Sequence, residues 1–161
     1  GGGKTLARAS LISNNVILSA FDKDPDRLKA LSHRADRAGI HVELLKKDPV
    51  IKDEKFDFVV LDVPCSGSGA WRRTPDAKWK LTPARLEELL ETQADILNTT
   101  SNLVTENGTL VYMTCSLFAS ENEEQISNFI ERVVGWKLTF SKHFELSSGT
   151  DGFYLAILNR L

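Results

Sequence analysis

Short apolar segments rich in β-branched and aromatic residues alternate along this chain with segments of helical periodicity. The expected strands cover residues 16–21, 40–45, 56–63, 109–114, 136–140 and 153–158. Between most of them, apolar residues recur every three or four positions, as on the buried face of a helix. Strands that alternate with helices predict an α/β fold whose core is a doubly wound, mostly parallel sheet.

Capping residues indicate where the expected helices begin and end. Asp24, followed by a proline, predicts a helix start, and Gly39 predicts its end. Thr82, also followed by a proline, predicts a long helix that ends at Asn107 and the glycine after it. Ser120 and Glu123 have the spacing of a capping box before a further helix.

In a parallel sheet, ligands bind at the edge where the strands end. Asp22 ends the first expected strand, residues 62–65 follow the third, and residues 114–116 follow the fourth. Both cysteines of the chain, Cys65 and Cys115, therefore lie at this edge. Topology alone makes the edge the candidate functional region.

Composition sets limits on the remaining possibilities. The length of 161 residues predicts a single domain over 1–161. Twenty basic residues against 22 acidic ones give a net charge of −2, which excludes a globally basic nucleic-acid binder but leaves room for a local basic patch. No apolar run approaches the roughly 18 residues of a membrane span, and no secretory signal is present, so a cytoplasmic location is expected. Two cysteines cannot build a disulfide framework.

The chain begins with the sequence GGGKT, residues 1–5, before an expected helix at 6–12. A glycine-rich turn into a helix presents free N–H groups that suit an anion or a nucleotide. Its end resembles half of a P-loop, with residues 59–62 as a Walker B strand, and a tag remnant is a further interpretation. Asp22 lies at about the 20-residue distance at which an acid binds ribose hydroxyls, although a helix-capping or solvated carboxylate fits equally well.

Two cysteine motifs are the most specific feature. Residues 62–69 read DVPCSGSG and residues 114–116 read TCS, and each motif follows an expected strand. Together they resemble the SAM-dependent RNA cytosine-C5 methyltransferases, the family of bacterial rRNA methyltransferases and nucleolar relatives. The resemblance extends to the acidic segment 120–123, to 71–76 with Trp79, and to 151–153, and so covers essentially the whole chain.

The resemblance implies a class I methyltransferase with a Rossmann-like fold and S-adenosylmethionine (SAM) as cofactor. It also implies that the domain's first strand would precede Gly1 and is missing, and it makes the P-loop interpretation much less favoured. The cofactor-binding residues that it implies are Gly1, Gly2, Gly3, Lys4, Asp22, Asp48, Asp62 and Pro64. For Asp48, a simple turn before Pro49 stays an alternative.

The chemistry explains why such an enzyme needs a thiol. C5 of cytosine is a poor nucleophile until a thiolate adds to C6, which is covalent catalysis. By resemblance, Cys115 is the nucleophile and Cys65 assists breakdown of the adduct, whereas the residues alone do not rank the two. Asp62 would bind the exocyclic amine or N3 of the target base. Inert packing is the alternative for both cysteines, and a turn cap is the alternative for Asp62.

Residues 64–80 are expected to form a loop whose second half is basic and aromatic. Basic side chains bind phosphates and aromatic rings stack on unpaired bases, so this segment is the candidate RNA contact. Its candidate residues are Trp71, Arg72, Arg73, Lys78 and Trp79, with a solvated loop anchored by the two tryptophans as the alternative. His33, His41 and His143 lack metal-ligand spacing, so no metal is expected.

The expected partner is RNA, with 16S-type ribosomal RNA favoured over transfer RNA, which the same motifs also fit. A module of the same fold that binds RNA or a protein without catalysis is the alternative from another class, and a P-loop NTPase is the third. The oligomeric state is left open by the sequence.

Overall fold

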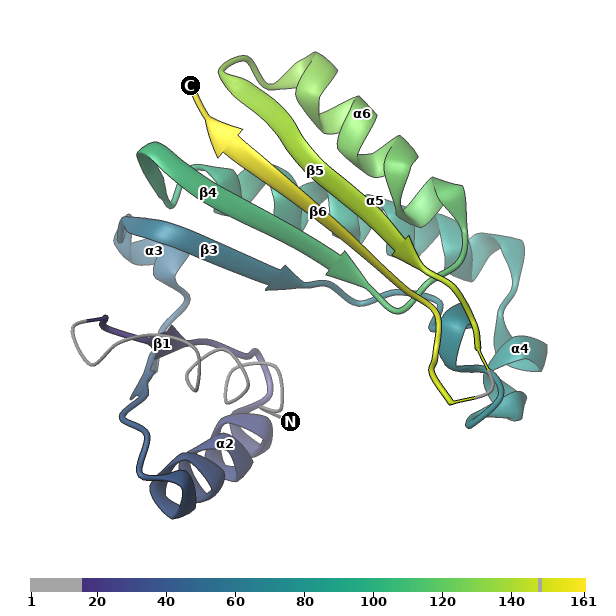
Figure 1. Cartoon of the computed structure of the whole chain (residues 1–161), viewed down its shortest axis with the longest axis horizontal. Helices are drawn as coiled ribbons and strands as arrows, with labels where there is room; N and C mark the ends of the chain where they lie inside the picture. Colours follow the sequence, from purple (N-terminus) through teal and green to yellow (C-terminus); the bar gives the residue numbers. More distant parts are fainter. Residues whose placement is uncertain (1–15, 148) are drawn as a thin grey trace. The chain divides into compact units, whose positions relative to one another are not determined.

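The computed structural model describes residues 16–147 and 149–161 (Figure 1). The chain divides into two compact units, residues 1–53 and 54–161. The glycine-rich segment 1–5 and the helix expected at 6–12 lie outside the described residues. The single catalytic domain expected over 1–161 stays a prediction.

The first unit contains one βαβ arrangement. Its elements are β1 (Ser19–Ala20), α2 (Pro25–Ala38), β2 (Glu43–Leu44) and α3 (Pro49–Lys52). β1 and β2 pair in parallel, as expected for strands connected by a helix. The ends of α2 are confirmed, because Asp24 caps its start and Gly39 ends it with a φ of 65°. The two strands are much shorter than the expected segments.

The second unit contains the longer strands. Its elements are β3 (Phe56–Asp62), the 3₁₀ turn η1 (Ser68–Ala70), α4 (Pro75–Lys80), α5 (Pro83–Ser101), β4 (Val104–Thr114), the 3₁₀ turn η2 (Ala119–Glu121), α6 (Glu123–Arg132), β5 (Trp136–Phe144) and β6 (Phe153–Arg160). They form a four-stranded sheet of order β3-β4-β6-β5. β3 and β4 are parallel, whereas β4–β6 and β5–β6 are antiparallel.

The parallel pair positions the candidate site. Asp62, the last residue of β3, pairs with Met113, the penultimate residue of β4. The two strands therefore end at nearly the same level. The segments that follow them, each with one cysteine, leave the sheet side by side.

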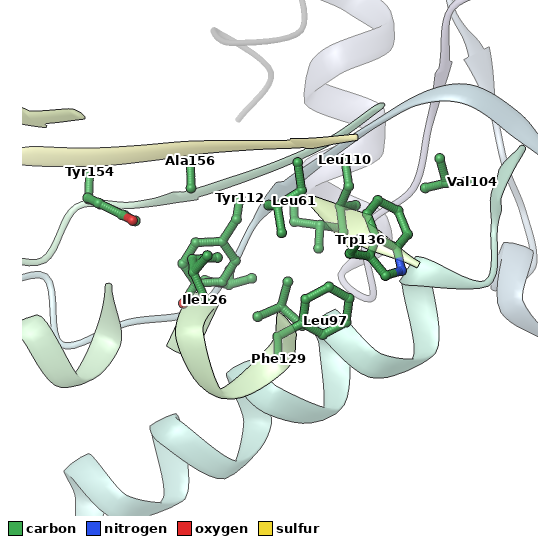
Figure 2. Packing of buried hydrophobic residues seen from close by; sticks show 12 residues of the cluster. Leu61, Leu97, Val104, Leu110, Tyr112, Ile126, Phe129, Trp136, Tyr154 and Ala156 are labelled. Carbon is green, nitrogen blue, oxygen red and sulfur yellow. The ribbon is translucent and has the colours of Figure 1, made fainter. Parts of the chain in front are cut away.

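The core of this unit lies between the sheet and the helices α5 and α6 (Figure 2). Its largest fully buried side chains include Tyr112 of β4, Phe129 of α6 and Leu97 of α5. The Tyr112 hydroxyl donates a 2.7 Å hydrogen bond to the carbonyl of Glu121, so its polar end is satisfied. Burial, followed by the Glu121 charge, raises the pKa of Tyr112. This packing attaches η2 to the central strand.

Three local expectations were wrong. The helix expected to reach Asn107 ends at Ser101, because 104–108 belong to β4: Val104 pairs with Phe56, and the register then shifts. The expected loop 64–80 contains η1 and α4.

The third is the capping box expected from Ser120 and Glu123. Ser120 lies in η2, and Asn122 stands at the N-cap of α6 without a side-chain capping bond. The Asn122 side chain instead accepts from the Thr114 hydroxyl at 2.6 Å and donates to the Ser116 carbonyl at 3.0 Å. Tertiary hydrogen bonds have replaced the local cap.

Within the described ranges, none of the helices combines the length and the apolar character that a bilayer crossing requires.

Candidate active site

The two cysteines meet at the carboxyl ends of β3 and β4. Cys65 follows β3 by three residues and Cys115 directly follows β4. Their Sγ atoms lie 3.3 Å apart, and both residues are partly buried free thiols. Two residues 50 positions apart in the sequence thus form one pair.

The environment of Cys65 favours its protonated form. A hydrogen bond to the Cys115 side chain, followed by burial and the Cys115 charge, raises the pKa of Cys65. Backbone hydrogen bonds from Gly67 and Cys115 lower it, but they are smaller effects. The arrangement therefore favours the thiol form of Cys65, since two thiolates at this distance would repel each other.

A tight backbone junction holds the loop after Cys65 against the loop after β4. The N–H of Gly69 donates to the Cys115 carbonyl at 2.9 Å, and the N–H of Gly152 donates to the Gly69 carbonyl at 3.0 Å. Gly67 has a φ of 67°, a conformation that favours glycine, and it begins the turn η1. Three chain segments therefore meet within van der Waals distance beside Cys115.

We expect Gly69→Ala to destabilise this junction. A Cβ at position 69 would collide with the Gly152 carbonyl oxygen and would lie 2.7 Å from the Gly152 carbonyl carbon and 2.9 Å from the Cys115 oxygen. All these atoms are backbone, so the segments must separate, at a cost of about 1–3 kcal/mol in the free energy of unfolding. Urea denaturation measures this loss.

Gly149→Ala is the matched control for this substitution. A Cβ at Gly149 has no heavy atom within 4 Å, and the residue is exposed. A Gly69→Ala protein as stable as the control would contradict the tight junction.

A buried carboxylate, which the sequence analysis did not select, joins the two cysteine loops. Glu121 is 0% exposed, and it accepts from the backbone N–H and the hydroxyl of Ser66 and from the hydroxyl of Ser116. Ser66 and Ser116 each follow a cysteine directly. The sequence analysis used Ser120 and Glu123 as a capping box and matched 120–123 to an acidic segment of the family, without assigning a role to Glu121.

The candidate cofactor acids Asp22 and Asp48 lie in the first unit, where they line one pocket of about 820 Å³. Asp22 accepts from the Asp24 N–H at 2.9 Å and Asp48 accepts from the Val50 N–H at 3.0 Å, so both carboxylates also organise their own turns. The pocket is lined by Phe21, Asp22, Lys23, Pro25, Leu28, Lys29, Ser32, His33, Leu44, Leu45, Lys46 and Asp48. Apolar walls that include Leu28 and Leu44, with carboxylates in the segments that follow β1 and β2, fit a nucleoside, whose base is flat and whose ribose donates hydrogen bonds.

The candidate RNA residues are not equivalent in the structure. Trp71 packs edge-to-face on Phe118 with ring centroids 5.8 Å apart, and its buried Nε1 has no hydrogen-bond partner in the described part of the chain. Arg73 forms an ion pair with Asp151, which also lies 4.0 Å from Arg72. Trp71 and Arg73 are thus both engaged within the fold.

The candidate residues on α4, Lys78 and Trp79, are exposed instead. Trp79 is 82% exposed, which is unusual for so large an apolar side chain. The Lys78 Nζ lies 5.6 Å from the centroid of its ring. This exposed aromatic–cationic pair is the part of segment 71–80 most available to a partner.

No group of three or more His, Cys, Asp and Glu side chains with the geometry of a metal site occurs among the described residues.

Comparisons with known proteins agree with this architecture. The structure is similar to a protein described as PH0851, with a TM-score of 0.90, 33% identity, and coverage of 99% of this chain and 40% of that one. It is also similar to NSun6 from Pyrococcus horikoshii with SFG, with a TM-score of 0.84, 27% identity, and coverage of 99% and 45%. The strand and helix arrangement and these neighbours define the fold as that of a class I SAM-dependent methyltransferase, Rossmann-like, which confirms the predicted fold class.

The sequence gives a closer assignment. The family model for "16S rRNA methyltransferase RsmB/F" matches residues 1–158, and this chain belongs to that family. The ribosomal RNA small subunit methyltransferase B of Shewanella oneidensis is 34% identical over 178 residues, which cover 98% of this chain and 40% of the relative. The chain thus spans about 40% of the length of such relatives. The match includes residues 1–5, and it favours the methyltransferase over the P-loop interpretation of that segment. SAM is the cofactor that this family assignment supports.

Proposed function

We propose that this protein transfers a methyl group from SAM to C5 of a cytosine in 16S-type ribosomal RNA. The observation that carries the proposal is the pair of thiols 3.3 Å apart at the ends of two neighbouring parallel strands, in a chain of this family. Two adjacent thiols suit a reaction with two steps, one that forms a covalent adduct and one that removes it.

Cys115 is the proposed nucleophile. Its thiolate adds to C6 of the cytosine, and the electron pair of the C5–C6 bond becomes available at C5. SAM supplies an electrophilic methyl group. Loss of the C5 proton then restores the double bond as the bond between C6 and the Cys115 sulfur breaks. Asp62, at the end of β3, would hold the exocyclic amine or N3 of the flipped base and balance the charge that develops there.

The residues proposed to hold SAM come from several segments. Asp22 would accept hydrogen bonds from the ribose hydroxyls and Asp48 would lie at the adenine, since both line the pocket of the first unit. Residues 1–4 and Pro64 stay predictions of the family resemblance.

The proposed RNA contact is α4, with Trp79 as a stacking surface. We expect Trp79→Ala to weaken RNA binding by roughly 5- to 150-fold, because stacking contributes about 1–3 kcal/mol per base. Protein stability should change little, since the ring is 82% exposed. Fluorescence anisotropy with a labelled ribosomal RNA fragment measures the affinity.

Val134→Ala is the control, because Val134 is 95% exposed but lies between α6 and β5, away from α4 in the sequence. Equal RNA affinity in both variants would remove Trp79 from the proposed contact.

The experiment that tests the function uses the full-length protein with methyl-labelled SAM. Unmodified 16S ribosomal RNA and transfer RNA are offered separately, and the products are digested and analysed by mass spectrometry. We expect label in 5-methylcytidine from 16S RNA. Label in another nucleoside or only in transfer RNA would contradict the proposal, and the absence of SAM binding would favour a non-catalytic module.

A further inference from the structure

Glu121 is a carboxylate buried in the second unit with no exposed surface. Burial of a charge is costly unless hydrogen bonds compensate it. Here four neutral donors reach the two oxygens. Oε1 accepts from the Ser66 N–H at 2.8 Å and from the Gln93 amide at 2.9 Å. Oε2 accepts from the Ser66 hydroxyl at 2.5 Å and from the Ser116 hydroxyl.

The donors identify what Glu121 connects. Ser66 adjoins Cys65 and Ser116 adjoins Cys115, so one side chain ties together the residues next to both thiols. The two hydroxyls also lie 3.2 Å from each other. Ser68 also contacts both serines, since its hydroxyl lies 3.1 Å from that of Ser116 and its backbone N–H donates to the hydroxyl of Ser66.

Glu121 is itself firmly placed. The Tyr112 hydroxyl of β4 donates to its carbonyl at 2.7 Å. The Gln93 amide, which reaches it from α5, also donates to the Pro64 carbonyl at 2.9 Å. Glu121 therefore links both cysteine loops to β4 and to α5.

We propose that Glu121 is a positioning residue that holds Cys65 and Cys115 at reaction distance. The proposal rests on the proposed function for its catalytic meaning, because Glu121 contacts the cysteine loops and not the sulfur atoms. In its absence the two loops keep the backbone hydrogen bond from Gly69 to Cys115 but lose the carboxylate that binds both Ser66 and Ser116. The distance between the two sulfur atoms then varies, so the two thiols no longer keep the fixed geometry that the two steps of catalysis need.

Thiol pairing tests the proposal without RNA or SAM. Diamide oxidises two neighbouring thiols to a disulfide: the sulfurs lose two protons and two electrons, and diamide is reduced to its hydrazine. The rate of disulfide formation in the full-length protein reports the effective concentration of Cys65 at Cys115. Mass spectrometry of the Cys65–Cys115 peptide pair gives the rate for this bond alone.

We expect Glu121→Ala to slow disulfide formation by about 10- to 100-fold, the scale on which misplacement of a reacting group acts. Glu121→Gln keeps the size and one acceptor, so it should lie between Glu121→Ala and the unaltered protein. Glu124→Gln is the matched control, because Glu124 is exposed in the first turn of α6. Thermal unfolding by circular dichroism accompanies each rate.

A folded Glu121→Gln or Glu121→Ala protein that forms the disulfide at the control rate would overturn the proposal. Loss of the fold in both variants would also overturn it, since Glu121 would then support the whole unit rather than the thiol pair. Methyl transfer is measured in parallel. If disulfide formation slows as expected while even the unaltered protein transfers no methyl group, the positioning role stands and the proposed function fails.

Discussion

Replacement of Cys115 by alanine is expected to abolish both methyl transfer and covalent capture of RNA. Loss of a covalent nucleophile removes the reaction path itself, so we expect turnover to fall by at least about a thousandfold. The fold should survive, because Cys115 is only partly buried and the change removes one atom. Turnover is measured with methyl-labelled SAM and 16S RNA.

Capture is measured with RNA that carries 5-fluorocytosine at the target position. Fluorine replaces the hydrogen that must leave C5, so the adduct cannot resolve and is seen as a shifted band on a denaturing gel. The unaltered protein should form this band and Cys115→Ala should not. Full turnover in the Cys115→Ala protein would show that the mechanism is wrong.

Replacement of Cys65 by alanine is expected to have the opposite effect on capture. Two of the three influences that raise the pKa of Cys65 come from Cys115, through the hydrogen bond and the charge. Once the Cys115 sulfur is bonded to C6, the charge effect disappears and the hydrogen bond weakens, because a thioether is a poor acceptor. The pKa of Cys65 should then fall toward its ordinary value, and the thiolate can accept the proton from C5.

Without Cys65 the adduct forms but resolves slowly, so turnover should fall by about 100-fold or more while natural RNA becomes trapped on the protein. The two substitutions make a matched pair, since they remove the same atom type at positions 3.3 Å apart. Denaturing gels with unmodified 16S RNA decide between them. If Cys115→Ala trapped RNA and Cys65→Ala did not, the roles of the two cysteines would be reversed.

Local chemistry made part of this fold predictable. The ends of α2 follow from Asp24 and Gly39, because a capping carboxylate and a left-handed glycine act within a few residues. The end of α5 was mispredicted at Asn107 because the pairing of Val104 with Phe56 involves a strand 48 residues away. Helix propensity carries no information on such a partner.

In the candidate site, too, local features were predictable and long-range contacts were not. Both cysteines could be assigned to one edge of the sheet, because strand ends and topology follow from the apolar pattern. Their 3.3 Å separation and the bridge through Glu121 could not, since they depend on side chains 50 and 55 residues apart. The pattern at 120–123 indicated a capping box of Ser120 and Glu123 in an acidic segment, and nothing in it distinguished Glu121.

The register of β3 against β4 determines whether the two thiols can meet. Asp62 is paired with Met113, and each cysteine follows within three residues. A slip of two residues keeps the alternation of buried and exposed side chains but moves one loop by about 7 Å. That shift exceeds the contact distance of the sulfurs. A chain whose two parallel strands pair two residues out of register therefore cannot bring its two thiols into contact.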